Sequence, residues 1–466
     1  MNKEKVFEYI DAHKDEMVET LCQLISYPSY QQESQEGAPF GKPVRECLDK
    51  ALEICESFGF KIRNYDGYVG TAEYTEGEPI LGILGHLDVV PEGTGWTYDP
   101  FKGTVADGKV FGRGSIDDKG PCVAVMYALK ALKELNIPLK KGVRLILGTN
   151  EENGSGDLAY FEKVAEMPKW LFTPDGNYPL INIEKGMIRG RISATPEACS
   201  CKRKLVCFHC GKTINAVPEL GYFEVAGVSE SEIEKAISAC KCEVGFTLEA
   251  TDNGIKVNAK GKSAHASTPD LGYNALTAML SLIKALGLDD NAGKLLAGLS
   301  EVFPYGETDG EHSGIKASDE VSGALTEVLS VLDYDDGKEI VGWIDIRFPV
   351  CENVESVKTK LEKSVSGAGF ALMAGGAEPH YVDSNSTFVK ELLSVYEDVT
   401  GNKGECIAIG GGTYVHHTEG GVAFGAEFPG EDNHMHGADE FMTIDSLLLN
   451  AKIFACAIER VCNSDL

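Results

Sequence analysis

Imidazole and carboxylate side chains gather in five short segments of this sequence, and none of the five contains cysteine. Imidazole nitrogen and carboxylate oxygen suit Zn, Mn or Co, whereas structural zinc sites commonly use thiolates. Acidic groups that lie together repel one another, and a cation relieves that cost. The segments therefore predict a metal centre, and bridging carboxylates favour a pair of ions. The segments are GHLD (85–88), GRGSIDDKG (112–120), NEENGSG (150–156), TPDG (173–176) and HGADE (436–440).

Three of these segments come directly after short apolar runs that predict strands. In open α/β sheets, the carboxyl ends of the strands form the ligand crevice. One His or Asp at a strand end is most often a hydrogen-bonded turn residue, but five such positions are far less expected by chance. The runs are 79–85, 143–148 and 170–173, and the residues that follow them are His86, Glu151, Glu152 and Asp175.

The elements that must position these residues change in character along the chain. At first, strand-like runs alternate with a helical stretch at 121–135, which predicts a mostly parallel sheet flanked by helices. After Gly186, short alternating segments mix with helices, and the first pattern returns from about Phe388. We therefore predict an α/β domain that is interrupted by an inserted α+β domain. The predicted boundaries are 1–185 with 385–466 for the first domain and 186–384 for the insertion.

The composition excludes several classes of partner. Asp and Glu number 72 against 43 Lys and Arg, and the net charge of −29 disfavours nucleic acid and anionic membranes. The first 24 residues predict an amphipathic helix rather than a signal peptide, and no apolar run approaches the roughly 20 residues of a membrane span. We therefore expect a cytoplasmic protein whose 14 cysteines are reduced.

Taken in order, the segments resemble a known enzyme family over nearly the whole chain. The segments GHLDVVP, GRGSIDDKGP, the Glu-Glu pair, TPDG, SAHASTP, GGTY and HGADE are similar to the co-catalytic zinc peptidases of the aminoacylase/carboxypeptidase group, most closely the bacterial dipeptidase V type. The resemblance implies a dizinc metallopeptidase that hydrolyses unblocked dipeptides, with Mn or Co as other possible ions. A deacylase of N-acyl amino acids and a non-catalytic peptide-binding protein are the alternatives.

The resemblance also implies a role for each motif residue. One ion would be held by His86, Asp117 and Asp175, and the other by Asp117, Glu152 and His436. Asp88 would hydrogen-bond the imidazole of His86, a partner that fixes the tautomer of a ligand. Glu151 would be the general base. The peptide bond between Asp117 and Asp118 is expected to be cis.

The inserted domain is implied to be a lid that closes over substrate. His265 in SAHASTP would donate to the oxyanion of the reaction, while Asn215 and Arg347 would contact substrate. We expect Arg347 to bind the C-terminal carboxylate through two hydrogen bonds, with a surface ion pair as the alternative. A lid of this length favours a monomer, although a homodimer stays open.

Two features depart from the family pattern or carry a weaker signal. GGTY is usually followed by Ala-Arg, whereas Val415 and His416 stand here, which places substrate specificity in doubt. Six cysteines resemble fragments of a zinc knuckle, but we interpret them as small buried hydrophobes. These cysteines are residues 199, 201, 207, 210, 240 and 242.

Overall fold

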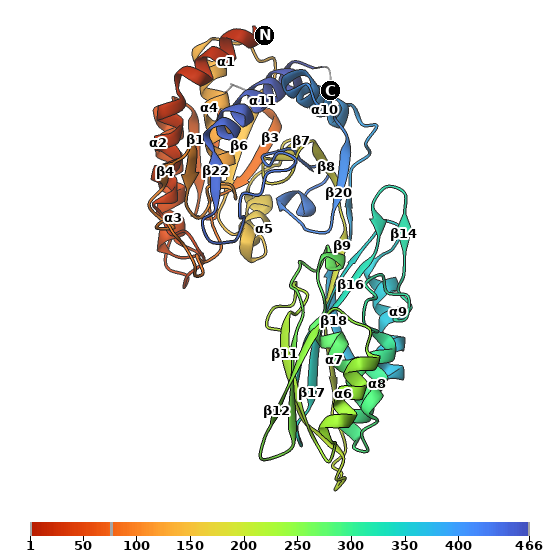
Figure 1. The fold of residues 1–466 in the computed structure, drawn as a ribbon. Helices are drawn as coiled ribbons and strands as arrows, with labels where there is room; N and C mark the ends of the chain where they lie inside the picture. Colours follow the sequence, from red (N-terminus) through yellow and green to blue (C-terminus); the bar gives the residue numbers. More distant parts are fainter. Residues whose placement is uncertain (1, 75–77, 465–466) are drawn as a thin grey trace. The chain divides into compact units, whose positions relative to one another are not determined.

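The computed structural model describes residues 2–74 and 78–464, which divide into two compact units. Unit 1 comprises Met1–Ile183, Tyr381–Ile407 and Gly412–Leu466, and unit 2 comprises Glu184–His380 and Ala408–Gly411. Both ends of the described chain belong to unit 1, where helix α1 packs against helix α11 (Figure 1). The short segment Ala408–Gly411 is not part of the insertion that we predicted.

Unit 1 is built on a nine-stranded sheet in the order β1-β2-β6-β3-β7-β21-β8-β19, with β20 beside β8. The α/β class is confirmed, but the sheet is mixed. The four central strands β6, β3, β7 and β21 are parallel, while the pairs β1–β2, β2–β6 and β21–β8 are antiparallel. The strands are β1 (Lys61–Tyr65), β2 (Val69–Glu73), β3 (Pro79–His86), β6 (Gly142–Gly148), β7 (Trp170–Thr173), β8 (Leu180–Glu184), β19 (His380–Tyr381), β20 (Cys406–Ile409) and β21 (Val422–Ala423).

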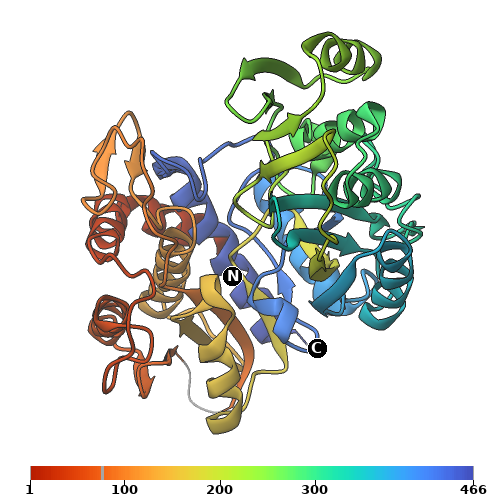
Figure 2. The same cartoon turned by 90° about the horizontal axis from the view of Figure 1, so that it is seen from below.

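Helices cover both faces of this sheet. Helix α4 is buried on all sides as far as Leu132, because its apolar residues run around the whole helix, and it packs against α11 and β3. In Figure 2, the blue α11 runs along the N-terminal part of the chain. The helices are α1 (Lys3–Ala12), α2 (Lys14–Ile25), α3 (Lys42–Ser57), α4 (Lys119–Glu134), α5 (Gly156–Val164), α10 (Thr387–Thr400) and α11 (Ile444–Asn463), with the 3₁₀ turns η1 (Glu151–Asn153) and η3 (Tyr414–His417).

A small antiparallel sheet, β22-β5-β4, joins two distant parts of unit 1. Strand β22 (Phe441–Thr443) pairs with β5 (Lys109–Phe111), which also pairs with β4 (Thr104–Ala106). This pairing brings the HGADE segment, which immediately precedes β22, next to the GRGSIDDKG segment, which immediately follows β5.

Unit 2 is an antiparallel sheet of eight strands with helices packed on one face, as expected for an α+β insertion (Figure 1). The strand order is β12-β13-β11-β10-β16-β17-β9-β18. The strands are β9 (Gly186–Ala194), β10 (Lys204–Cys210), β11 (Leu220–Ala226), β12 (Gly245–Ala250), β13 (Ile255–Lys260), β16 (Thr326–Asp335), β17 (Ile340–Phe348) and β18 (Ala371–Ala377), with the hairpin β14 (Ser318–Asp319) and β15 (Gly323–Ala324). The helices are α6 (Glu230–Ala239), α7 (Ala275–Leu286), α8 (Asn291–Val302) and α9 (Val354–Gly367), with the turn η2 (Pro269–Leu271).

Candidate metal centre

Three parallel strands of unit 1 deliver acidic and imidazole groups to one edge of the sheet. His86 is the last residue of β3 and lies in register with Gly148, the last residue of β6. Glu151 begins the turn that follows β6, and Asp175 lies two residues after β7. Because these strands are parallel neighbours, their carboxyl ends meet, and the side chains that follow them converge.

Asp117 lies between β5 and α4 and faces both imidazoles of the cluster. Its Oδ1 is 3.0 Å from His86 Nε2, and its Oδ2 is 2.7 Å from His436 Nε2. His436 Nε2 also lies 3.2 Å from Glu152 Oε1, and His86 Nε2 lies 3.6 Å from Asp175 Oδ2. The carboxylate of Asp117 therefore stands between two groups of ligand atoms, the arrangement that a bridging ligand requires.

The ligand atoms form two groups, each with all atoms within 4.8 Å of one another. One group holds Asp117, Glu152 and His436, which is the set expected for the second ion. The other holds His86, Asp175 and Glu151, where the expected set had Asp117 in place of Glu151. The structure thus brings all six residues together, and it places Glu151 as close to the first ion site as a ligand would be.

The electrostatics of this cluster are those of a site built for cations. Burial raises the pKa values of Glu151, Glu152 and Asp175, and repulsion from neighbouring carboxylates, that of Asp117 in each case, adds to the rise. Burial lowers the pKa of His436, but the hydrogen bonds to Asp117 and Glu152 outweigh it and raise that pKa to about 11. Bound protons thus supply positive charge among the clustered acidic groups, as bound cations would.

His86 supplies an independent test of whether a metal ion fits. Its side chain is fully buried, and its Nε2 makes no hydrogen bond although carboxylates face it. Its Nδ1 is 3.0 Å from the backbone oxygen of Asp88, which leaves Nε2 as the lone-pair nitrogen that a metal needs. A buried ring nitrogen without a hydrogen bond, surrounded by carboxylate oxygens, fits a divalent cation of the Zn class.

The hydrogen bond that we expected between Asp88 and the imidazole of His86 is made by the backbone oxygen of Asp88 and not by its carboxylate, and the carboxylate has a second set of partners. It lies 3.5 Å from His86 Nδ1, and it accepts hydrogen bonds of 3.1 Å from the backbone nitrogens of both Glu151 and Glu152. Asp88 therefore fixes the turn that carries the acidic pair, in addition to lying beside the imidazole.

A buried ion pair that the sequence analysis missed links the two loops of the second group. Arg113 and Glu440 are 1% and 0% exposed, and Arg113 Nη1 donates to Glu440. Glu440 also accepts from the backbone nitrogens of Gly114 and Ile116, and Arg113 Nη2 donates to Gly437 O. Both residues lie within the motifs that we singled out, but only the fold shows that they pair.

A second buried carboxylate, Asp157, supports the start of the Glu151 turn. It accepts from the backbone nitrogens of Thr149 and Asn150 and from the hydroxyl of Tyr414 in the GGTY motif. Gly148 is required here, because an added Cβ would lie 2.0 Å from the Tyr414 oxygen. This close approach explains why the strand ends in glycine.

The three expected lid residues all lie in unit 2. His265 and Asn215 are on adjacent segments, where Ala216 bridges to His265 and the nitrogen of Ala266 donates to Asn215 O at 2.9 Å. Arg347, which is 5% exposed, donates from Nε and Nη2 to Asp345 at 2.6 and 3.1 Å and from Nη1 to Gly410 O. The pairing with Asp345 is buried, unlike the surface ion pair that we considered.

Several other expectations can be compared with the structure. The Asp117–Asp118 peptide bond is cis, as expected. Cys199 and Cys201 form a disulfide, so the expectation that all cysteines are free thiols is wrong for this pair, whose positions two residues apart place the sulfurs together. Of the six cysteines that we interpreted as small buried hydrophobes, Cys210 alone is buried, so that interpretation is wrong for the other five, of which Cys199 is exposed. No thiolate cluster with metal-ligand spacing occurs in residues 2–74 and 78–464.

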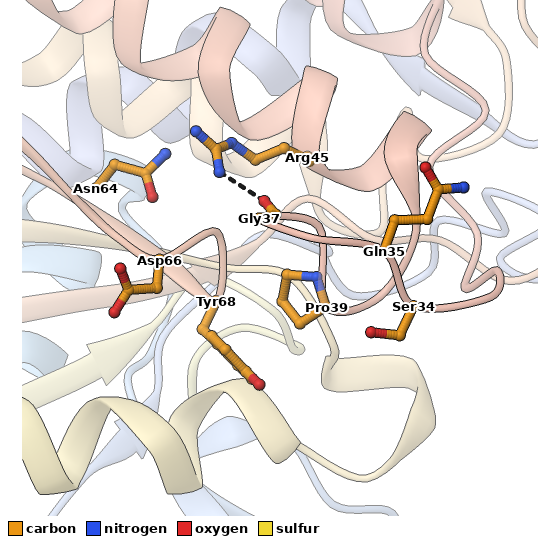
Figure 3. A pocket seen from close by; sticks show the side chains of 8 residues that line it. All are labelled: Ser34, Gln35, Gly37, Pro39, Arg45, Asn64, Asp66 and Tyr68. Atoms are coloured by element: carbon orange, nitrogen blue, oxygen red, sulfur yellow. Dashed lines mark hydrogen bonds between the residues drawn. The ribbon is translucent and has the colours of Figure 1, made fainter.

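A polar surface hollow of about 470 Å³ in unit 1 is separate from these residues (Figure 3). Arg45 borders it and donates from Nη1 to Gly37 O and from Nε to Asp49. None of the site residues lines the hollow, and its one guanidinium is already paired. It therefore has no part in the metal chemistry.

Comparison with known proteins gives a consistent family. Residues 82–460 match the model of "Peptidase family M20/M25/M40". The chain is 38% identical over 430 residues to "Putative dipeptidase YtjP" of Bacillus subtilis, covering 91% of each protein. It is 34% identical over 478 residues to a protein of Staphylococcus epidermidis that is also named as a dipeptidase, covering 100% of each.

Solved structures show the same fold at low sequence identity. Human carnosine dipeptidase 1 matches with a TM-score of 0.64 at 17% identity, over 100% of this chain and 99% of that one. The dipeptidase Dug1p of Saccharomyces cerevisiae matches with a TM-score of 0.61 at 13% identity, again over 100% and 99% of the chains.

Proposed function

The chain belongs to the peptidase family M20/M25/M40, and on that premise we propose that it is a dizinc dipeptidase that cleaves the amide bond of unblocked dipeptides. It is a metal-dependent hydrolase of peptide bonds by its family. The observation that carries the proposal is the position of Asp117 between two groups of ligand atoms, one around His86 and one around His436.

Two divalent ions would be held by five side chains of unit 1. Imidazole and carboxylate ligands without thiolate favour Zn, and Mn or Co could also occupy such a site. When bound, a pair of such ions lowers the pKa of water and polarises the carbonyl that is to be attacked. The proposed ligands are His86 and Asp175 for one ion, Glu152 and His436 for the other, and Asp117 for both.

Glu151 would act as the proton carrier of the reaction. Burial raises the pKa of its carboxyl group, which suits a group that accepts a proton near neutral pH and later gives it up. The hydrogen bond from its backbone nitrogen to Asp88 fixes its position beside the cluster. Glu151 would take a proton from the attacking water and deliver it to the nitrogen of the departing amine.

His265 would stabilise the negative charge that develops on the carbonyl oxygen. The backbone nitrogen of Ser267 lies 3.2 Å from His265 Nδ1 and donates to it, so the ring proton belongs on Nε2. An Nε2–H donor can contribute roughly 3–4 kcal/mol to lowering the barrier. Asn215, on the adjacent segment, would contact the same substrate.

Arg347 would bind the C-terminal carboxylate of the dipeptide. Asp345 occupies the Nε–Nη2 edge of the guanidinium and thereby fixes its plane. Nη1 donates one of its hydrogens to Gly410 O, so Nη1 and Nη2 each keep one further N–H that could meet a carboxylate.

The remaining aspects of the proposal follow from composition and chain organisation. The acidic net charge of −29 argues against nucleic acid and anionic membranes as partners. In the part of the chain that the structure describes, no helix has the length and apolar character needed to cross a bilayer. We propose a cytoplasmic location and a monomer, because a lid as long as unit 2 would complete the site within one chain.

A substrate panel tests this function against its alternatives. Free dipeptides and acetylated or succinylated amino acids would be assayed with added Zn, Mn or Co, and Glu151→Ala would serve as the inactive control. Cleavage of the free dipeptides alone is expected. Preferential cleavage of the acylated amino acids would indicate a deacylase, and peptide binding without turnover would indicate a non-catalytic protein.

A further inference from the structure

A cavity of about 200 Å³ lies inside unit 2, beside the first half of β16. Strand β10 pairs only with the second half of β16, from Leu332 to Asp335. Next to the first half, the segment 269–274 and the loop 303–308 take the place of a strand and border the cavity. We call this space the β16 cavity. Its volume is close to the share of liquid that roughly seven water molecules occupy.

Four acidic residues line the β16 cavity, and no Lys or Arg lines it. Glu243 accepts from the hydroxyl of Tyr305 at 2.9 Å, and Asp270 accepts from that of Thr308 at 2.5 Å. Glu307 pairs with a histidine, and none of the four has Lys or Arg within 4.0 Å in the described chain. In the described residues, no Lys or Arg side chain therefore pairs directly with the carboxyl groups of this cavity.

Glu327 is the acidic residue that indicates a ligand. It lies on β16, is 5% exposed and accepts one hydrogen bond of 3.0 Å from Ser313 to its Oε2. Its Oε1 is buried without a hydrogen-bonding partner. Burial raises the pKa of Glu327 to about 8, and the charges of Glu307 and Asp309 add to the rise. A buried acceptor of this kind is costly unless a donor reaches it.

The other walls of the cavity are apolar. Val217, Phe303, Val328 and Leu329 line it together with the acids. In the described residues, the groups of three ligand atoms with metal-ligand spacing are those of the candidate metal centre, and the carboxylates of this cavity form no such group. Apolar walls with separated carboxylates suit a hydrocarbon chain that ends in N–H donors.

We propose that the β16 cavity binds a small primary alkylammonium or diamine, with an ammonium group at the carboxylate of Glu327 and the methylene chain against Val328 and Phe303. The ligand would contact the segment 269–274, which begins four residues after His265. Binding would therefore favour one arrangement of the segment that carries this histidine. The proposal does not depend on which peptide or amide the metal centre cleaves.

Calorimetric titration of the full-length protein with 1,4-diaminobutane and with n-butylammonium tests the proposal. At pH 9, where Glu327 is ionised and the amines are still charged, we expect saturable binding with a dissociation constant on the order of 1 mM or tighter. 1-Butanol, the neutral probe of the same length, should not bind. Glu327→Gln should weaken the binding of both amines at least about tenfold.

The exposed residue Glu320 provides the matched control, because Glu320→Gln removes the same charge outside the cavity. This variant should bind the amines as the unchanged protein does. Asp270→Asn, a change at an exposed lining residue, should weaken binding several-fold and serves if Glu327→Gln does not fold. The proposal is wrong if neither amine binds saturably, or if the cavity variants bind as tightly as Glu320→Gln. Binding is measured directly, so an inactive metal centre would not alter the result.

Discussion

Asp117 is the residue at which the two halves of the candidate metal centre meet. Its two carboxylate oxygens face different imidazoles, at 3.0 Å from His86 and 2.7 Å from His436. Burial raises the pKa of Asp117, but the two histidines outweigh it and hold that pKa below its ordinary value, so its carboxylate is ionised. An ionised carboxylate with one oxygen directed towards each imidazole is what a bridging ligand between two divalent ions requires.

Substitution of Glu151 separates a proton carrier from a metal ligand, because the structure places it near the first ion site. Glu151→Gln should lower kcat by about 10²–10⁴-fold and leave the bound metal unchanged. Rates on a free dipeptide and elemental analysis of the same sample would be measured. Loss of one ion together with activity would mean that Glu151 is a ligand.

Glu327 predicts a pH dependence of stability that is unrelated to the metals. Its folded-state pKa of about 8 is above the ordinary 4.5, so the folded state favours the protonated form. The contribution of Glu327 to the free energy of unfolding is therefore fully present below pH 4.5 and is lost as pH rises towards 8. Glu327→Gln cannot ionise and should melt at least ~5 °C above the unchanged protein at pH 9, and with a smaller difference at pH 6. The groups that face Glu327 are Glu307, Asp309 and Ser313. A melting difference that does not change with pH would contradict this assignment.

Residue type and position after a strand were enough to expect His86, Glu151, Glu152 and Asp175 at one edge of the sheet, because the ends of parallel strands meet there. Asp117 and His436 do not follow parallel strands, and they were expected only from the family resemblance. The partners of these residues could not be predicted in the same way. Asp88 accepts hydrogen bonds from the backbone nitrogens of Glu151 and Glu152, which lie 63 and 64 residues away in the sequence. Nothing in the sequence around Asp88 indicates these partners. Arg347 was interpreted without its partner Asp345, although the two lie on the same face of one strand.

At the scale of elements, the pairing of β22 with β5 brings the two loops of the second ion site together. Glu440 accepts hydrogen bonds from two backbone nitrogens in the loop that leads to Asp117. Arg113 donates a hydrogen bond to the backbone oxygen of Gly437, the residue after His436. The ion pair thus fixes the distance between two proposed ligands from opposite ends of the chain. We assign Arg113 and Glu440 as positioning residues.

Removal of this ion pair should weaken metal binding while the rest of the fold is kept. Glu440→Gln should weaken the affinity for the metals by about 10–100-fold, and Arg113→Lys should lose less than Arg113→Met. Competition with a chelator would measure the affinity. Glu73→Gln removes the partner of Arg144 and is the control, since that pair joins β2 to β6 away from the site. Equal affinities of Glu440→Gln and Glu73→Gln would contradict the positioning role.

Strand order is the part of the fold that the sequence could not supply. The apolar runs predicted β3, β6 and β7. The antiparallel pairing of β1 with β2, and of β2 with β6, was not predicted, because β2 meets β6 through contacts between distant segments. Ala408–Gly411 belongs to unit 2 because Gly410 O accepts from Arg347 and Ile409 O accepts from Lys185. Such contacts have no local sequence pattern.

At the scale of the whole molecule, composition gave an expectation about partners but little information about the fold. The excess of acidic residues sets the net charge, and the two units follow from the change in pattern near residue 186. The number of chains in the assembly has to be inferred from the length of the lid, because no residue of the sequence reports it.

Light scattering on the eluted protein would test the proposed monomer. A single chain has a mass of 50.2 kDa, and we expect that value independently of protein concentration. An enlarged lid would make a second copy unnecessary for the site, which is the physical reason for this expectation. A species of twice that mass at all concentrations would show a dimer.

The number of divalent ions per chain, compared between the unchanged protein and Asp117→Asn, tests the central claim most directly. Elemental analysis after removal of the metals and dialysis against Zn should give two ions per chain for the unchanged protein. Asp117→Asn should retain fewer than one, because the bridge serves both ions. Glu151→Gln, analysed alongside, should retain both. Two ions per chain in Asp117→Asn would show that this residue does not join the two sites.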